Sequence, residues 1–410
     1  MPRKKLRVGV LFGGRSGEHE VSLRSACSIL QAIDRSKYEV VELGITREGR
    51  WLSGQPAQAM LAAEAAATGT AKREATGSVK REATGQAKRE TKGRSAGEVA
   101  GRALSKSAGE PEGGVSIAAA AGEPAVGTGL DVVFPVLHGT FGEDGTVQGL
   151  LELAGVAYVG SGVLGSAAAM DKDAMKRLFA AAGLPMTPHV TVLRSAWRAD
   201  PRRTMQSIEK KLRYPLFVKP ANLGSSVGIS KVKTRADLAA AMDLAAGFDR
   251  KIVIEQGVGG PGVKPRELEV AVLGNDDPEA SVVGEIVPAK EFYDYEAKYE
   301  LSGPDESLCI IPARLTAAQA RRIRTMAIAA FKACECAGLA RVDFLMAPAS
   351  KGRPAEIVVN EVNTLPGFTS ISMFPKLWIA SGLPYPKLID RLIELAMERH
   401  KERAETRFSR

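Results

Sequence analysis

The stretch LRVGVLFGG at residues 6–14 predicts a buried β-strand that ends in two glycines. The spacing of apolar residues over 21–32 predicts an amphipathic helix after it, and residues 38–45 predict a second strand. A third strand is expected at 132–137, directly before His138 and Gly139. This alternation is typical of a parallel α/β layer, in which functional loops lie at the carboxyl ends of the strands.

The rest of the chain keeps alternating strand and helix patterns. Helices are expected over 171–182, 235–246, 317–337 and 386–398. Strands are expected over 216–219, 229–232, 251–255, 268–273, 281–287, 340–346 and 355–361. The chain is therefore expected to be an α/β protein, with α+β character in its later part.

Residues 57–129 differ from this pattern. They contain no aromatic residue, and an eight-residue unit recurs as KREATGSV at 72–79, KREATGQA at 80–87 and KRETKGRS at 88–95. Such a polar unit is too short for a solenoid repeat and buries little surface, and its regular glycines disfavour one long helix. We expect a disordered, low-complexity insertion over 57–129.

The composition excludes several classes of protein. The 410 residues include 45% hydrophobic and 25% charged residues, which is typical of a folded domain. The net charge of +9 comes partly from basic runs at the two ends, and no basic stripe with aromatic residues suggests nucleic acid. No stretch approaches the roughly 20 apolar residues that cross a bilayer. We expect no membrane association.

Cysteine and histidine are both scarce. Four cysteines without a CxxC pair fit a reducing cytoplasm, where we expect the protein to be located. Four histidines make a zinc site of the usual kind improbable. Any bound metal is therefore expected to have oxygen ligands.

Two strands near the end of the chain carry side chains with oxygen atoms that could bind a metal, and one of them also carries an arginine. Alternation places Arg341 and Asp343 on one face of their strand, and Glu361 and Asn363 on one face of the next. The three oxygen-bearing side chains suit Mg²⁺, although acids at strand ends are more often caps or ion-pair partners. The turn at 364–367 follows, and its backbone N–H groups could face a developing negative charge.

Three loops carry further candidate residues. Lys219 ends a strand before the Gly/Ser loop at 224–228, which could hold phosphate through its backbone amides or be a simple hairpin turn. No GxxxxGK[ST] loop occurs in the chain. Glu18 stands at a helix start, where it could be an ordinary cap, and His138 lies in a glycine-rich polar loop, where it could be structural.

Together these segments resemble the D-alanine–D-alanine ligases of the ATP-grasp superfamily. The matching pieces, in order, are GGRSGEHEVS, HGTFGEDGTVQG, YVGSGVLGSAAAMDK, VKPANLGSSVG, RELEVAVLGN, YDYEAKY, RVDF and NEVNTLPGFTSIS. The resemblance implies an N-terminal α/β domain over 1–160 and a two-part ATP-grasp fold. The central subdomain would span 161–257, the C-terminal catalytic subdomain 258–398, and a basic tail 399–410.

The resemblance also implies the roles of individual residues. ATP would be held by a set of side chains and loop residues: Lys172, Lys219, Gly224, Ser225, Ser226, Glu255, Val258 and Glu267. Two Mg²⁺ (or Mn²⁺) ions would be bound by Asp343, Glu361 and Asn363. One departure is Gln256, where many relatives carry lysine.

The substrate-binding and catalytic residues follow by the same resemblance. Glu18 would bind the ammonium of the first D-alanine, with His138 also in the substrate site, and Ser372 would hold the carboxylate of the second. Arg341 and the Gly367 N–H would stabilise an oxyanion. Ser225, Tyr299 and Glu18 would form the hydrogen-bonded triad that fastens a mobile loop.

The resemblance implies ATP-dependent ligation of two D-alanines, through an acyl phosphate, for peptidoglycan precursors. The expected partners are ATP and D-alanine, in a homodimer. The alternatives are a D-alanine–D-lactate ligase, another ATP-grasp carboxylate–amine ligase, and an inactive nucleotide-binding module that recruits partners through its insertion. The Lys298-Tyr299 pair favours the dipeptide-forming enzymes over the lactate-forming ones.

Overall fold

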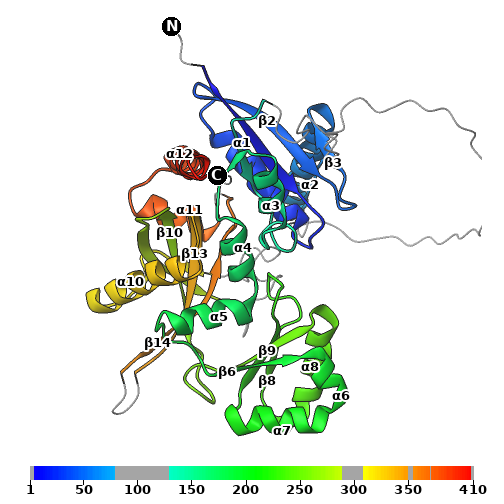
Figure 1. The fold of residues 1–410 in the computed structure, drawn as a ribbon, viewed down its shortest axis with the longest axis vertical. Helices are drawn as coiled ribbons and strands as arrows, with labels where there is room; N and C mark the ends of the chain where they lie inside the picture. Colours follow the sequence, from blue (N-terminus) through cyan, green and yellow to red (C-terminus); the bar gives the residue numbers. More distant parts are fainter. Residues whose placement is uncertain (1–3, 79–128, 289–307, 350–353, 370, 408–410) are drawn as a thin grey trace, which may run out of the picture.

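The computed structural model describes residues 4–78, 129–288, 308–349, 354–369 and 371–407. Three sheets organise this part of the chain (Figure 1). The N-terminal sheet (blue) and the central sheet (green) lie at opposite ends of the long axis. Along this axis the C-terminal sheet lies between them. The α/β fold class expected from the sequence is confirmed.

The N-terminal sheet is the expected parallel layer. Its strands are β1 (Leu6–Gly13), β2 (Tyr38–Ile45), β3 (Trp51–Ser53), β4 (Val132–Pro135) and β5 (Ala157–Tyr158), in the order β3-β2-β1-β4-β5. Only β3 runs antiparallel to its neighbour. Val8, Val10 and Phe12 enter one core cluster and Leu11 another, so β1 is buried on both faces.

Helices cover both faces of this layer. They are α1 (His19–Ala32), α2 (Gln55–Ser78), α3 (Thr146–Leu153) and, from the far end of the chain, α12 (Tyr385–Ala404). The buried Asp390 of α12 accepts hydrogen bonds from Lys37 Nζ (2.6 Å) and Tyr38 Oη (3.1 Å). The C-terminal helix is thereby fixed to the N-terminal layer.

Helix α2 corrects the expected start of the insertion. It begins at Gln55, and Ala57 and Leu61 are buried against the sheet, with exposed fractions of 0% and 7%. Its first turns are rich in alanine, the best helix former, and the glycines that disfavour a helix come later. The insertion therefore does not begin at residue 57, and residues 79–128 lie outside the described part of the chain.

The central sheet is antiparallel. It contains β6 (His189–Leu193), β7 (Leu216–Pro220), β8 (Ser230–Val232) and β9 (Lys251–Gln256), in the order β6-β9-β7-β8. Helices α6 (Arg194–Ala199), α7 (Pro201–Lys211) and α8 (Arg235–Phe248) pack on it. Two helices precede it, α4 (Val163–Met170) and α5 (Lys172–Ala181), and the Asp171 side chain caps α5.

The C-terminal sheet is also antiparallel, and its two faces differ. Its strands are β10 (Arg266–Gly274), β11 (Glu279–Val287), β12 (Leu308–Ile310), β13 (Gly338–Ala347) and β14 (Glu356–Asn363), in the order β12-β11-β10-β13-β14. Leu268, Val270 and Val272 share a core with α10 (Ala317–Ala333). Ala271 and Leu273 share another with α11 (Met373–Ala380). Residues with odd numbers in β10 therefore face away from α10.

The basic C-terminal segment is not wholly a solvated tail. Helix α12 continues to Ala404, so the last helix does not end at 398 as expected from the sequence. The Arg399 guanidinium lies 4.4 Å from the centre of the Tyr158 ring and donates to the Tyr158 carbonyl, because a planar cation can stack and donate at once. In the described residues, no helix is both long and apolar enough to cross a membrane.

Candidate active site

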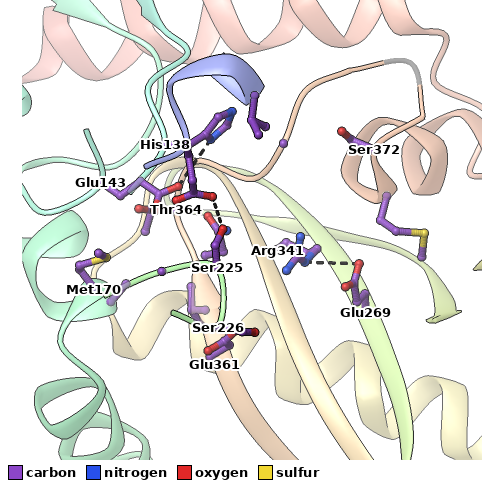
Figure 2. Close-up of a pocket in the computed structure, with 18 of the residues that line it drawn as sticks. His138, Glu143, Met170, Ser225, Ser226, Glu269, Arg341, Glu361, Thr364 and Ser372 are labelled. Atoms are coloured by element: carbon purple, nitrogen blue, oxygen red, sulfur yellow. Dashed lines mark hydrogen bonds and ion pairs between the residues drawn. The ribbon is translucent and has the colours of Figure 1, made fainter. Parts of the chain in front are cut away.

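A cavity of about 250 Å³ collects most of the candidate residues (Figure 2). Its lining comes from all three parts of the fold, because the loops after β1, β4 and β7 meet the open face of the C-terminal sheet. The candidates that line it are Glu18, His138, Lys172, Gly224, Ser225, Ser226, Arg341, Glu361, Asn363, Gly367 and Ser372.

The register of the C-terminal sheet brings the acidic residues and Arg341 together. Arg341 lies opposite Asn363, and Asp343 lies opposite Glu361, so these side chains share a face as expected. Nε and Nη2 of Arg341 each donate to one Asp343 oxygen, both at 2.7 Å. Burial alone would lower the pKa of Arg341, but the neighbouring carboxylates outweigh it and raise that pKa well above its ordinary value. Arg341 therefore stays charged.

Glu269 belongs to this cluster and was not predicted as a site residue. It lies opposite Asp343 on β10, and its Oε2 is 3.3 Å from Arg341 Nε; Figure 2 shows the two side chains pointing toward each other. Alternation within RELEVAVLGN could have found it, since Glu269 shares a strand face with Ala271. Arg341 thus lies between two carboxylates.

A buried group of lysines lies behind the glycine loop. Glu255, 3% exposed, accepts a hydrogen bond from Lys219 Nζ at 2.9 Å on its Oε2, and its Oε1 forms an ion pair with Lys176 Nζ at 3.1 Å. Burial would raise the pKa of Glu255, but the two lysines outweigh it and lower that pKa to about 2. Lys176 was missed, although its position four residues after Lys172 places both on one face of α5.

Lys172 and Lys219 differ in their electrostatic surroundings. Lys172 Nζ donates to the Leu223 carbonyl at 2.6 Å, which ties α5 to the glycine loop. Burial lowers the pKa of Lys172, although Glu361 opposes the shift. For Lys219 burial also acts to lower the pKa, but Glu255 outweighs it and the pKa is raised. Lys172 is therefore the more easily deprotonated of the two.

Glu18 contacts the glycine loop directly. Although it is the N-cap residue of α1, its side chain makes no capping hydrogen bond, and Ser225 Oγ donates to Glu18 Oε1 instead. Ser225 and Ser226 hold positive φ angles of 49° and 61°, which turn the loop toward the N-terminal domain. Tyr299, the third member of the expected triad, lies outside the described residues.

His138 is buried at the edge of the cavity. Its Nδ1 lies 2.9 Å from the Leu365 carbonyl and 3.7 Å from Glu143 Oε1, and its Nε2 lies 3.3 Å from Ser25 Oγ. Burial acts to lower the pKa of His138, but Glu143 outweighs it and the pKa is raised. Glu143, a second residue not predicted for the site, has its own pKa raised by burial and by Glu18.

Ser372 and Gly367 lie together at another side of the cavity. Ser372 Oγ accepts from the Thr369 N–H at 3.1 Å and lies 2.8 Å from Thr369 Oγ1. A Cβ at Gly367 would meet Ser372 Oγ at 3.0 Å, so the turn and this hydroxyl are in close contact. In Figure 2, Ser372 lies on the α11 side of Arg341, away from Ser225 and Ser226.

The remaining residues expected to bind the nucleotide and the metal lie outside the lining of this cavity. Lys219, Glu255, Val258, Glu267 and Asp343 do not line this cavity. Val258 packs against Ala347 and Val358. Within the described ranges, no three His, Cys, Asp or Glu side chains form a metal-binding group by themselves, so the expected set relies on the Asn363 amide as its third ligand.

Comparisons with known proteins cover nearly the whole chain. The family model for the D-ala D-ala ligase N-terminus matches residues 7–161, and the model for the C-terminus matches residues 178–394. The D-alanine–D-alanine ligase of Geobacillus thermodenitrificans is 48% identical over 399 residues, covering 97% of each chain. D-alanine–D-alanine ligase A of Escherichia coli K12 is 45% identical over 397 residues, again covering 97% of each.

Solved structures agree with these sequence matches. The D-alanine–D-alanine ligase of Coxiella burnetii aligns with a TM-score of 0.73 and 34% identity, covering 98% of this chain and 97% of that one. The VanG D-Ala:D-Ser ligase of Enterococcus faecalis aligns with a TM-score of 0.71 and 33% identity, covering 96% and 100%. The chain therefore belongs to the D-alanine–D-alanine ligase family.

Proposed function

We propose that this protein joins two D-alanine molecules to D-alanyl-D-alanine at the expense of ATP, supplying a peptidoglycan precursor. The observation that carries the proposal is the Ser225–Glu18 hydrogen bond, which places a carboxylate beside a glycine loop in the cavity that also holds Lys172 and Arg341. A site with an anchor for an ammonium group, cations for phosphate and a buried arginine suits carboxylate activation.

The first step would activate one D-alanine. Its ammonium would bind Glu18, and one oxygen of its carboxylate would attack the γ-phosphorus of ATP. The bond from that phosphorus to the β,γ-bridging oxygen breaks, ADP leaves with the electron pair, and an acyl phosphate forms. Lys172, Lys219 and the loop at 224–228 would hold the phosphates, so their contribution is positioning and charge neutralisation.

The donor set fits divalent cations that accompany ATP. Asp343, Glu361 and Asn363 present carboxylate and amide oxygens on one face of β13 and β14, and Mg²⁺ prefers such ligands. We propose that two Mg²⁺ or Mn²⁺ ions are held there and supply charge neutralisation to the phosphates.

The second step would form the peptide bond. The second D-alanine loses a proton from its ammonium to solvent, the free amine attacks the acyl carbon, and the attacking nitrogen then releases a second proton to solvent. The tetrahedral intermediate then expels inorganic phosphate, which leaves with the electrons of the C–O bond. Arg341 and the Gly367 N–H would stabilise the oxyanion, and Ser372 would bind the acceptor's carboxylate.

A second candidate function differs only in the acceptor. The VanG structure, whose title describes a D-Ala:D-Ser ligase, aligns with 33% identity over 96% of this chain. We therefore keep ligation of D-alanine to D-serine, and to D-lactate, as alternatives on the same site. We further propose a cytoplasmic homodimer.

The test is a substrate panel. Purified protein receives ATP, Mg²⁺ and D-alanine, alone or with D-serine, D-lactate or L-alanine, and phosphate release is followed together with product mass. D-alanyl-D-alanine should dominate in every mixture. Phosphate release without a coupled dipeptide would contradict the proposal. A larger yield of the product with D-serine or D-lactate would show that this molecule is the preferred acceptor.

A further inference from the structure

We propose that Lys376 binds the carboxylate of the second substrate and so makes the enzyme select acceptors with a free carboxylate. This inference rests on the proposed function, since it concerns the acceptor of that reaction. Lys376 lies on α11 and lines the cavity, and neither the motifs nor the resemblance assigned it a role.

The cations of the cavity differ in whether they are already paired. In the part of the chain that the structure describes, four lysine and arginine side chains line it, namely Arg24, Lys172, Arg341 and Lys376. Arg24 pairs with Glu64 at 2.9 Å, and Arg341 pairs with Asp343 and Glu269. Lys172 donates to the Leu223 carbonyl. Among the described residues, the side-chain ammonium of Lys376 has no hydrogen-bond or ion-pair partner, so it is the cation in this set that is open to an anionic ligand.

The Ser372 hydroxyl could bind the same carboxylate as Lys376. Lys376 lies one helical turn after Ser372, and its backbone N–H donates to the Ser372 carbonyl at 3.3 Å. Ser372 Oγ already accepts the Thr369 N–H, and when the Thr369 hydroxyl also donates to it, the Ser372 proton is free to point outward. A lysine ammonium and a serine O–H together can satisfy both oxygens of one carboxylate.

The location favours the acceptor rather than the nucleotide. The predicted phosphate-binding residues Lys172 and Ser226 belong to α5 and the glycine loop. Ser372 lies on the α11 side of Arg341, away from that loop (Figure 2). Arg341 is the proposed oxyanion residue, so a carboxylate bound beside Ser372 would place the acceptor on the Arg341 side of the cavity rather than at the glycine loop.

The inference predicts a specific chemical preference. Removing the Lys376 ammonium should remove the attraction for the acceptor's carboxylate and leave the donor, ATP and metal contacts in place. A hydrogen bond to a charged group corresponds to roughly 10- to 100-fold in affinity. The affinity for D-alaninamide, an acceptor without a carboxylate charge, should not change.

The experiment is a competition within one reaction. Wild type, Lys376→Met, Lys376→Gln and Lys376→Arg receive ATP, Mg²⁺, D-alanine and D-alaninamide, and mass spectrometry gives the ratio of D-alanyl-D-alanine to its amide. The ratio should fall at least about tenfold in the Met and Gln variants. In the Arg variant, which keeps the positive charge, the ratio should be close to that of wild type. Lys332→Met, at an exposed lysine of α10, is the charge-matched control and should keep the wild-type ratio.

Each other outcome is decisive. Because both products come from one acyl phosphate in one tube, partial unfolding lowers both and leaves the ratio unchanged. An unchanged ratio with an unchanged acceptor KM in both neutral variants overturns the role of Lys376, as does a rise confined to the KM for ATP. Failure of the wild type to make any dipeptide would instead overturn the proposed function itself.

Discussion

Ser225 Oγ donates a hydrogen bond to Glu18 Oε1, and this contact joins residues 207 positions apart in the chain. Ser225 belongs to the loop between β7 and β8, and Glu18 begins α1 of the N-terminal layer. The hydrogen bond therefore connects the central sheet to the N-terminal sheet across the cavity. Since Glu18 is also the proposed ammonium anchor, we expect loop closure and binding of the first substrate to be coupled at one carboxylate.

Ser225→Ala should uncouple ATP use from ligation. The variant loses a hydrogen bond to a charged group, roughly 1.5–3 kcal/mol, so the loop should open more often and expose the acyl phosphate to water. We expect more ADP per dipeptide than in wild type, measured as the ratio of the two products. Ser207→Ala, at an exposed serine of α7, is the control. Tight coupling in Ser225→Ala would rule out this role.

Gly139→Ala should displace Glu18. A Cβ at Gly139 would lie 2.8 Å from Glu18 Oε2, and the residue has a φ of +72° that disfavours alanine. Gly183→Ala is the matched control, because Gly183 has a φ of +68° with nothing within 4 Å of its Cβ. Both variants should lose about 1 kcal/mol of stability in thermal unfolding. Only Gly139→Ala should raise the KM for D-alanine, by about tenfold or more; equal kinetics in the two would contradict the steric argument.

Glu361→Gln and Asp343→Asn should each lower kcat at least about 100-fold while the fold survives. Asp343 accepts both Arg341 hydrogen bonds, and Glu361 lies opposite it, so each substitution removes charge from the face proposed to bind the metal ions and the oxyanion. Steady-state rates over a Mg²⁺ titration give the effect, and circular dichroism checks the fold. Asp276→Asn, an exposed change of the same kind, should behave as wild type. Near-normal rates at low Mg²⁺ would reject the ligand assignment.

Lys172 should set an alkaline limit on ATP binding. Its pKa is lowered by burial, so Lys172 loses its charge below the ordinary lysine pKa of roughly 10.4, and the KM for ATP should rise as the pH passes through this lowered pKa. Because the unfolded chain keeps this proton longer, the contribution of this group to stability increases with pH over the same window. Lys172→Arg should move the alkaline limb of the ATP KM to higher pH. An unmoved limb would show that another group titrates.

Two deletions should distinguish the contribution of helix α2 to stability from that of the repeats. Replacing residues 79–128 with a short Gly/Ser linker should leave kcat and Tm near wild type, because this sequence is polar and repetitive. A deletion that starts at Ala59 also removes the buried Leu61 and the Glu64 partner of Arg24, and should cost several kcal/mol. The two variants are compared by urea unfolding. Equal stability would mean that the buried turns of α2 contribute nothing.

The sequence alone was sufficient for local structure and for the residues of single motifs. The buried apolar run ending in two glycines at residues 6–14 predicted β1, and the alternation of Arg341 with Asp343 and of Glu361 with Asn363 predicted which side chains share a face. These features depend on neighbours within a few positions, so they can be read along the chain. The start of the insertion was misjudged because a low-complexity composition masked the apolar residues Ala57 and Leu61.

The pairings within the cavity could be decided only by the tertiary structure. Glu269 with Arg341, Lys176 with Glu255 and Ser225 with Glu18 join different elements, so no local spacing indicates them. The same holds for Lys376, which reads as an ordinary helical lysine and becomes notable only because the other cavity cations have partners. Sequence periodicity fixes which way a side chain faces on its own element, whereas the packing of separate elements determines which charges meet and which are left for a ligand.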